Sequence, residues 1–177
     1  MFKIVWNTTE VEREILSHEN DYMFLSFWTP IEIYVNNVDI TGLKEIPEGE
    51  ITQFGDIFRN NLFLFRGLDL EKLHDKQFHF GSNIDNEVSG GGFKYYIDLD
   101  KSTDVLTIRY TNRAIKEYRT LKIPLKDFAE GVLNSTKEML DMVLKIAPEK
   151  REDNNYLSIQ MDYETILEWY RNRYGVK

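Results

Sequence analysis

The clearest helical pattern in the chain lies in residues 124–147, which read PLKDFAEGVLNSTKEMLDMVLKIA. Pro124 suits the first turn of a helix, where its missing N–H would have no partner. Gly131, Asn134 and Ser135 have low helix propensity, so tertiary packing must hold the middle of this helix. Its apolar positions recur every three or four residues, which predicts one buried face: Leu125, Phe128, Ala129, Val132, Leu133, Thr136, Met139, Leu140, Val143, Leu144 and Ala147.

Three segments with strand-like alternation directly precede this helix. Their connections are short, which predicts an antiparallel meander with strands at residues 93–98, 105–110 and 118–123. We therefore expect an α+β fold in which an antiparallel β-sheet (meander 93–123) is covered by the long helix 124–147 and a C-terminal helix 162–174. The length of 177 residues fits a single domain spanning residues 1–177.

The N-terminal segment predicts a strand followed by a short helix. Residues 2–6 alternate between apolar and polar side chains, as in a strand. Thr9 and Glu12 have the spacing of a capping box. The helix that they would open is expected to end near His18.

The region between these elements and the meander is less regular. The apolar run 22–28 predicts a strand buried on both faces, and Asn36-Asn37 suits a tight hairpin turn with residues 38–41 returning. Residues 51–66 favour a helix, with a pair of strands as the alternative. Residues 77–80 predict a short strand, and residues 81–92 a long polar loop.

The C-terminal part predicts one further helix. Residues 149–155 are charged and are expected to form a mobile connection. Residues 156–161 would add an edge strand, and Asp162 would then cap the helix 162–174.

The charge of the chain limits its partners. The net charge is −8; residues 1–90 carry 16 acidic against 7 basic residues, and residues 91–177 carry 14 against 15. Binding to phosphates needs an excess of Lys and Arg, so this balance argues against nucleic acid and against anionic membrane surfaces. The absence of cysteine excludes disulfides and cysteine-based metal sites. The N-terminus lacks a signal peptide pattern and no apolar run is long enough for a membrane span, so we expect a cytoplasmic protein.

Two motifs deserve comparison with known ligand sites. The spacing Asp98-x-Asp100-x-x-x-Asp104 resembles a calcium loop, but the sixth position is not glycine and the twelfth is not glutamate. A hairpin turn with solvated carboxylates explains it better. The glycine run at residues 89–92 opens a strand, whereas a phosphate cradle opens a helix. Neither motif therefore predicts a bound ion.

No catalytic, cofactor-binding or metal-binding residue is predicted. The three histidines, His18, His74 and His79, are not spaced as metal ligands, and no serine lies in a nucleophile-elbow pattern.

In size, acidity, lack of cysteine and meander-then-helix layout, the chain resembles the small immunity proteins of bacterial toxin systems. The resemblance implies a cytosolic inhibitor that binds a cognate toxin domain and neutralises it. If that toxin is a nuclease, its site is basic, and acidic side chains would mimic phosphate there. The carboxylates expected at the contact surface belong to two turns: Asp85, Glu87, Asp98, Asp100 and Asp104.

Two other function classes stay open from the sequence. One is an enzyme whose site is assembled from scattered His and carboxylate residues, with His74 or His79 beside two acids. The other is a structural or regulatory module that self-associates through an exposed sheet edge or apolar patch.

Overall fold

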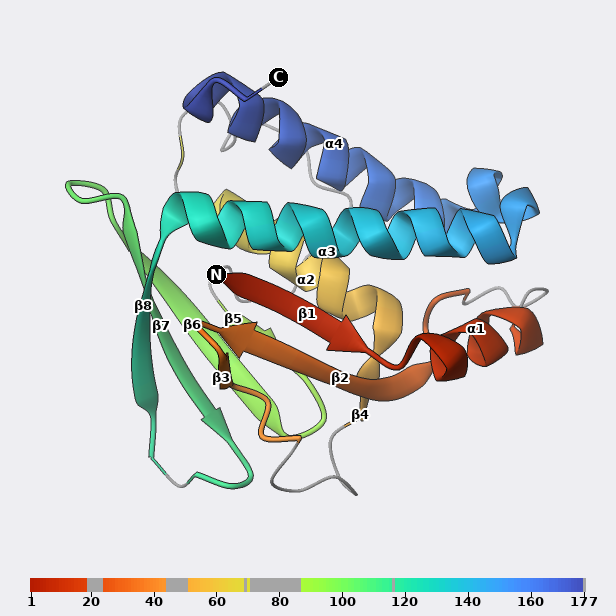
Figure 1. Cartoon of the computed structure of the whole chain (residues 1–177), viewed down its shortest axis with the longest axis horizontal. Coiled ribbons are helices and arrows are strands. Elements are labelled where there is room, and N and C mark those ends of the chain that lie inside the picture. Colours follow the sequence, from red (N-terminus) through yellow and green to blue (C-terminus); the bar gives the residue numbers. More distant parts are fainter. Residues whose placement is uncertain (19–23, 44–50, 69, 71–86, 116, 177) are drawn as a thin grey trace.

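Two antiparallel sheets and four α-helices make up the computed structural model, which describes residues 1–18, 24–43, 51–68, 70, 87–115 and 117–176 (Figure 1). The first sheet contains β1 (Phe2–Trp6), β2 (Trp28–Val35), β3 (Val38–Asp39) and β4 (Ile51–Gln53). The second contains β5 (Glu87–Ser89), β6 (Phe93–Asp100), β7 (Val105–Asn112) and β8 (Arg119–Pro124). The helices are α1 (Thr8–Ser17), α2 (Phe54–Gly67), α3 (Leu125–Ile146) and α4 (Asn154–Tyr174), with a 3₁₀ turn η1 (Pro148–Glu152) before α4. The expected α+β class, with a long helix and a C-terminal helix, is confirmed.

The second sheet contains the predicted meander and one extra strand. Its order is β5-β6-β7-β8, and β6 pairs with β7 from Phe93 opposite Asn112 to Asp100 opposite Val105. Strand β5 lies within residues 81–92, where a loop was expected, so that part of the prediction is wrong. The buried side chain of Val88, between two less buried neighbours, anchors this short strand to the core.

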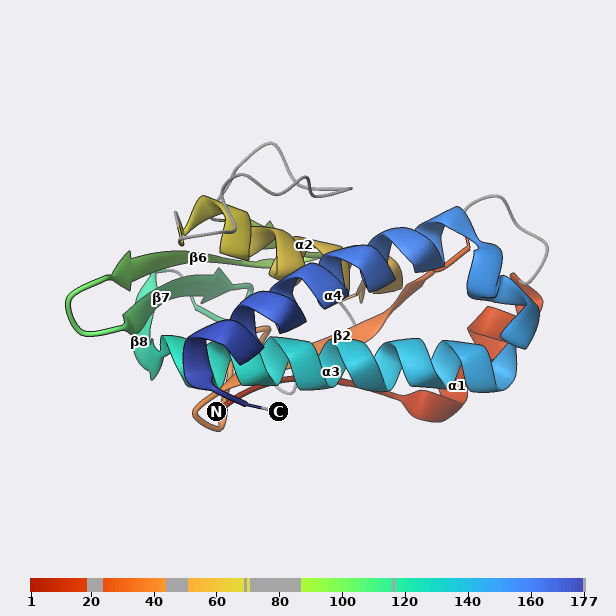
Figure 2. The same cartoon turned by 90° about the horizontal axis from the view of Figure 1, so that it is seen from above.

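Helix α2 contacts both sheets and both long helices. Ten of its fourteen residues are buried. Phe54 stacks on Phe27 beside the first sheet, with ring centroids 5.2 Å apart. On the second sheet, the hydroxyl of Tyr95 donates to the side-chain oxygen of Asn61, and complete burial raises the pKa of Tyr95. Figure 2 shows α2 lying beside α4.

Phe65 of α2 contacts both of the long helices. Its ring centroid lies 5.6 Å from that of Phe128 on α3 and 5.6 Å from that of Trp169 on α4. Helix α4 therefore packs mainly on the other helices, and its apolar residues complete the core from the side away from the sheets. The predicted helix in residues 51–66 is confirmed from Phe54, after the short strand β4.

Helix α3 runs along the free edge of β1 (Figure 1). The hydroxyl of Ser135 accepts a 3.1 Å hydrogen bond from the backbone N–H of Ile4. A Cβ on Gly131 would lie 2.2 Å from the carbonyl oxygen of Phe2, so only glycine permits this approach. Two of the weak helix formers in the middle of the helix, Gly131 and Ser135, are thus the residues that meet the strand, and they cover an edge that would otherwise be open to pairing.

The structure corrects the predicted C-terminal region. Residues 156–161 are not an edge strand, because Tyr156 and Ile159 are buried on one face of α4. The cap of this helix is Asp153, whose carboxylate accepts hydrogen bonds from the N–H groups of Asn155 and Tyr156, at 2.8 and 3.3 Å. Asp162, expected as the cap, is buried in the middle of the helix. Part of the expected mobile connection forms η1.

The structure also corrects two N-terminal assignments. The cap of α1 is Asn7 rather than Thr9: its side chain accepts a hydrogen bond from the N–H of Glu10 at 3.2 Å. Of the apolar run 22–28, residues 22 and 23 lie outside the described residues, and residues 24–27 are not a strand; β2 begins at Trp28. The carbonyl of Leu25 instead accepts a 2.7 Å hydrogen bond from Gly55 at the start of α2, so this segment turns to cap that helix.

Other expectations about the N-terminal half have mixed outcomes. The Asn36-Asn37 turn is confirmed, with φ values of 50° and 67°. The predicted strand at 77–80 lies outside the described residues. Within the described part of the chain, no helix combines the length and apolar character needed to cross a membrane.

The close contact between α3 and β1 makes a testable prediction. Gly131→Ala should lower the free energy of unfolding by about 1–3 kcal/mol, because the new methyl group forces the helix away from the strand. The matched control is Asn134→Ala, one turn along on the exposed face, which should cause no loss. Urea unfolding followed by circular dichroism measures both, and equal midpoints would show that α3 does not lie against β1 at Gly131.

Candidate functional site

The outward side of the second sheet carries a cluster of charged and aromatic side chains. We call this the outer sheet face and define it by residues from four neighbouring segments: Glu87, Lys94, Tyr96, Asp98, Arg109, Tyr118 and Lys122. Their strand positions align in rows, because Tyr96 lies opposite both Glu87 and Arg109, and Asp98 and Lys122 both lie opposite Thr107. The alternate positions of β6, such as Tyr95, are buried in the core.

Lys94 lies between the two tyrosines of this face. Its ammonium nitrogen is 5.8 Å from the ring centroid of Tyr96 and 5.9 Å from that of Tyr118. The ammonium of Lys94 donates a hydrogen bond to the Tyr118 hydroxyl, and this lowers the pKa of Tyr118. The same hydrogen bond raises the pKa of Lys94. The pKa of Tyr96 is raised, chiefly by its hydrogen bond to Glu87. The two phenols therefore differ in acidity although their rings lie 5.9 Å apart.

The carboxylates of the outer sheet face have partners on the same face. Asp98 lies 3.5 Å from the guanidinium of Arg109, and Glu87 is engaged by Tyr96. Lys94 and Lys122 remain as cations without an acidic partner among the described residues. On a chain with a net charge of −8, this face is therefore locally positive.

A shallow depression of about 480 Å³ adjoins one end of the outer sheet face. It lies over the glycine-rich turn between β5 and β6 and is lined by residues 89–94 and 111–113. Its charged lining residues are Lys94 and Arg113, and Arg113 donates a 2.6 Å hydrogen bond to the carbonyl of Gly91.

Four of the five acids expected from the sequence lie in the described residues, and these four have different partners. Glu87 and Asp98 lie on the outer sheet face, and Asp85 lies outside the described residues. Asp100 closes the turn between β6 and β7: its carboxylate accepts hydrogen bonds from the hydroxyls of Ser102 and Thr103, at 2.6 and 2.8 Å, which lowers its pKa.

Asp104 has a different role, at the junction of the second sheet with the long helices. Its carboxylate accepts a 2.7 Å hydrogen bond from Arg173 near the end of α4, and its carbonyl accepts one of 2.8 Å from the N–H of Leu125 at the start of α3. Asp104 has a positive φ of 59°, which directs these groups towards the helices. This side chain is thus already engaged within the chain.

A second candidate surface is the acidic groove, which we define as the groove between β1 and α3. It encloses about 440 Å³, and its acidic residues, Asp127, Glu130 and Glu138, lie on one side of α3. Glu130 and Glu138 are exposed and form no ion pair with any described residue. The cations at the groove are Lys3 and the amino group of Met1, which lies 3.6 Å from Asp127.

Sequence reasoning placed these acids on the polar face of the helix but did not identify them as a site. Their helical spacing was the available signal. The groove itself depends on β1, which is more than a hundred residues away in sequence, and no pattern within either segment specifies that pairing.

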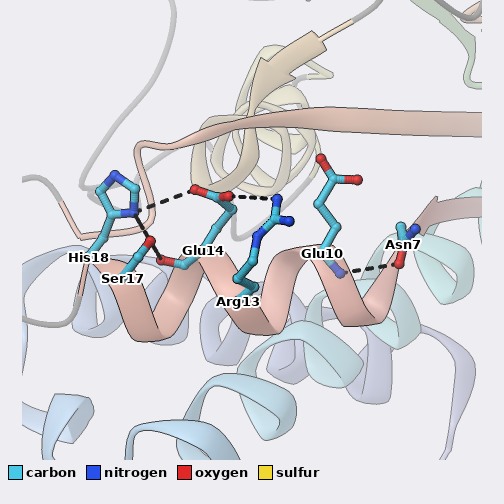
Figure 3. A network of polar contacts seen from close by, with 6 residues as sticks. All are labelled: Asn7, Glu10, Arg13, Glu14, Ser17 and His18. Atoms are coloured by element: carbon cyan, nitrogen blue, oxygen red, sulfur yellow. Dashed lines mark hydrogen bonds and ion pairs between the residues drawn. The ribbon is translucent and has the colours of Figure 1, made fainter.

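The polar network on α1 has the composition of a catalytic triad but not its geometry (Figure 3). The ring nitrogen Nδ1 of His18 lies 2.9 Å from the hydroxyl of Ser17 and 3.7 Å from the carboxylate of Glu14. A triad needs the serine and the acid on opposite ring nitrogens, so that a proton can be relayed. Here both face the same nitrogen, and the Ser17 hydroxyl also donates to the backbone carbonyl of Glu14. The network therefore acts as a C-terminal cap of α1.

The remaining histidines, His74 and His79, lie outside the described residues. Among the residues whose placement is given, no three His, Asp or Glu side chains come together as a metal site would require.

Comparisons with family models, with curated proteins and with solved structures found no match.

The geometry around Lys94 predicts the titration of its neighbours. Tyr118 should ionise at lower pH than Tyr96, because the Lys94 ammonium stabilises its phenolate and the Glu87 carboxylate opposes ionisation of Tyr96. Lys94→Met should raise the pKa of Tyr118. Lys145→Met, at an exposed position on α3, should leave it unchanged. NMR titration of tyrosine labelled on the ring with ¹³C measures these values, and identical titration of both phenols would contradict the contact.

Proposed function

We propose that this chain is a non-catalytic binding protein of the bacterial cytoplasm, an immunity protein that neutralises a cognate toxin domain. The observation that carries the proposal is the acidic groove, where exposed carboxylates lie beside a concave surface without compensating ion pairs for Glu130 and Glu138. A basic toxin site is the complementary partner. The proposal also draws on the resemblance in size, acidity and lack of cysteine.

The acidic groove has the dimensions of a macromolecular contact. Asp127 and Glu138 are eleven residues apart, which corresponds to roughly 16 Å along a helix. Glu130 and the amide of Asn134 lie between them on the same side. A row of this length can meet several cations of a phosphate-binding site, as the phosphates of a nucleic acid would.

The net charge supports rapid capture of such a partner. Exposed charges of one sign attract a partner of the opposite sign and raise the association rate, most strongly at low salt. Within the first 90 residues, nine of the 16 acidic residues lie outside the described residues, among them Asp85. The contribution of Asp85, Glu87, Asp98, Asp100 and Asp104 to partner binding remains a prediction.

The two rival classes receive no specific support from the described residues. The His18 network lacks the geometry of a catalytic relay. The free edge of β1, a natural site for self-association, is covered by α3.

A toxicity assay tests the proposed function. The product of the gene directly upstream should stop bacterial growth when expressed alone, and co-expression of this chain should restore growth. A harmless upstream product, or toxicity that persists beside equal amounts of the folded wild-type chain, would show that the immunity function is wrong.

Charge reversal tests the role of the acidic groove. Glu130→Lys with Glu138→Lys should lower the association rate constant for the toxin domain roughly tenfold or more at low salt, because steering is reversed at the contact. The matched control is Glu164→Lys with Glu168→Lys, the same charge change at exposed positions on α4 outside the groove. Stopped-flow binding measures both pairs. Equal losses would place the contact elsewhere, and circular dichroism confirms that each variant folds.

A further inference from the structure

We infer that the outer sheet face is a second binding surface, which takes a short acidic segment of a partner protein. This inference is independent of the toxin partner proposed for the acidic groove. It rests on the arrangement of Lys94, Lys122 and the two tyrosines on one uninterrupted side of the sheet.

Charge complementarity identifies the partner chemistry. The face holds three cations and two carboxylates, a balance of +1, because the Glu87 carboxylate keeps its charge while it accepts a hydrogen bond from Tyr96. Asp98 pairs with Arg109 at 3.5 Å, so Lys94 and Lys122 are the cations of this face without an acidic partner among the described residues. An acidic segment is attracted to this face and is repelled by Glu130 and Glu138 at the acidic groove, whereas a basic segment is favoured at the groove.

The tyrosines add hydrogen bonds and apolar area to this attraction. Tyr118 is 49% exposed, the largest exposed aromatic fraction on this sheet among the described residues. Tyrosine and arginine are enriched at protein interfaces because they combine a large contact area with polar groups. A carboxylate of the partner at Lys94 would lie within reach of the Tyr118 hydroxyl, and the adjoining depression of about 480 Å³ offers room for the side chains that follow.

A peptide fits this face better than a single-stranded nucleic acid does. Nucleic-acid sheets present open aromatic rings on which bases stack. Here the Lys94 ammonium lies 5.8 and 5.9 Å from the ring centroids of Tyr96 and Tyr118, and the two rings are inclined at 56° to each other.

Fluorescence anisotropy with defined probes tests the inference on the whole chain. A labelled peptide of alternating glutamate and serine should bind, and its affinity should fall as salt is raised. The corresponding lysine–serine peptide and labelled oligo(dT) should bind less well. Backbone amide shifts in two-dimensional NMR should be confined to the second sheet, from β5 to β8, with the β5–β6 turn and the turn before β8.

Charge reversal locates the contact. Lys94→Glu and Lys122→Glu should each weaken binding of the glutamate–serine peptide roughly fivefold, as expected for loss of an exposed ion pair and introduction of a repulsive charge. Lys145→Glu makes the same charge change on α3, away from this sheet, and should leave the affinity within error. Tyr118→Ala should weaken binding, whereas Met161→Ala, at a side chain of matched 48% exposure on α4, should not.

Three results would overturn the inference. One is equal weakening by Lys145→Glu and Lys94→Glu, which would indicate a general charge effect. Another is tighter binding of oligo(dT) than of the acidic peptide, which would indicate a nucleic-acid surface. The third is the absence of binding by a chain whose circular dichroism shows that it is folded.

Discussion

The contact between the middle of α3 and the free edge of β1 is the constraint on which the first sheet depends. An edge strand exposes a row of unpaired backbone groups, and proteins must cover or block it. Here Gly131 lets the helix approach the carbonyl of Phe2, and Ser135 satisfies the N–H of Ile4 at 3.1 Å. These two residues sit four positions apart, so they lie on the same side of the helix. Residues that lower helix propensity are thus the ones that specify where the helix lies.

The same contact explains why α3 could be predicted and its position could not. The apolar spacing defines a buried face, and the confirmed burial of Phe128, Val132 and Leu140 follows from it. The pattern also indicated that packing must hold the weak central turn. It did not indicate that the packing partner is the edge of a strand at the other end of the chain, because helical periodicity carries no information about the partner surface.

Helix α2 was harder to predict from the sequence than α3. Ten of its fourteen residues are buried, and its unbroken apolar run at residues 62–65 suits a buried strand as well as a helix, so strands compete with the helix as an interpretation. Its polar residues are explained only by tertiary contacts: Asn61 accepts the hydroxyl hydrogen bond of Tyr95, and Arg59 donates to Asn155 at 2.9 Å. Asp162 was expected to cap a helix that begins at that point, but it is buried inside α4. The apolar residues before it, including Tyr156 and Ile159, belong to the same helix.

The candidate surfaces, too, could be predicted from the sequence only in part. The alternation of residues 93–98 predicted a strand but did not show which side faces the core; the structure buries Tyr95 and places Lys94, Tyr96 and Asp98 on the opposite side of the sheet. The placement of Tyr118 next to Lys94 required the register of three strands, which residue alternation does not give. The acids of the β6–β7 turn were expected together at a partner surface, yet Asp104 is bound by Arg173 and Asp100 by its own turn.

Asp104 connects the parts of the fold that carry the two candidate surfaces. Through Arg173 and Leu125 it fixes the β6–β7 hairpin to α4 and α3 at once, so the sheet and the helix that carry the two surfaces are held in one arrangement. Side chains on a fixed sheet or helix lose less conformational freedom on binding than those on a loop, which leaves more of the contact energy for affinity. A carboxylate that appeared in the sequence as a candidate contact is thus better understood as part of the frame. It joins the sheet that carries the lysines of the outer sheet face to the helix that carries the carboxylates of the acidic groove, in a chain whose net charge is −8.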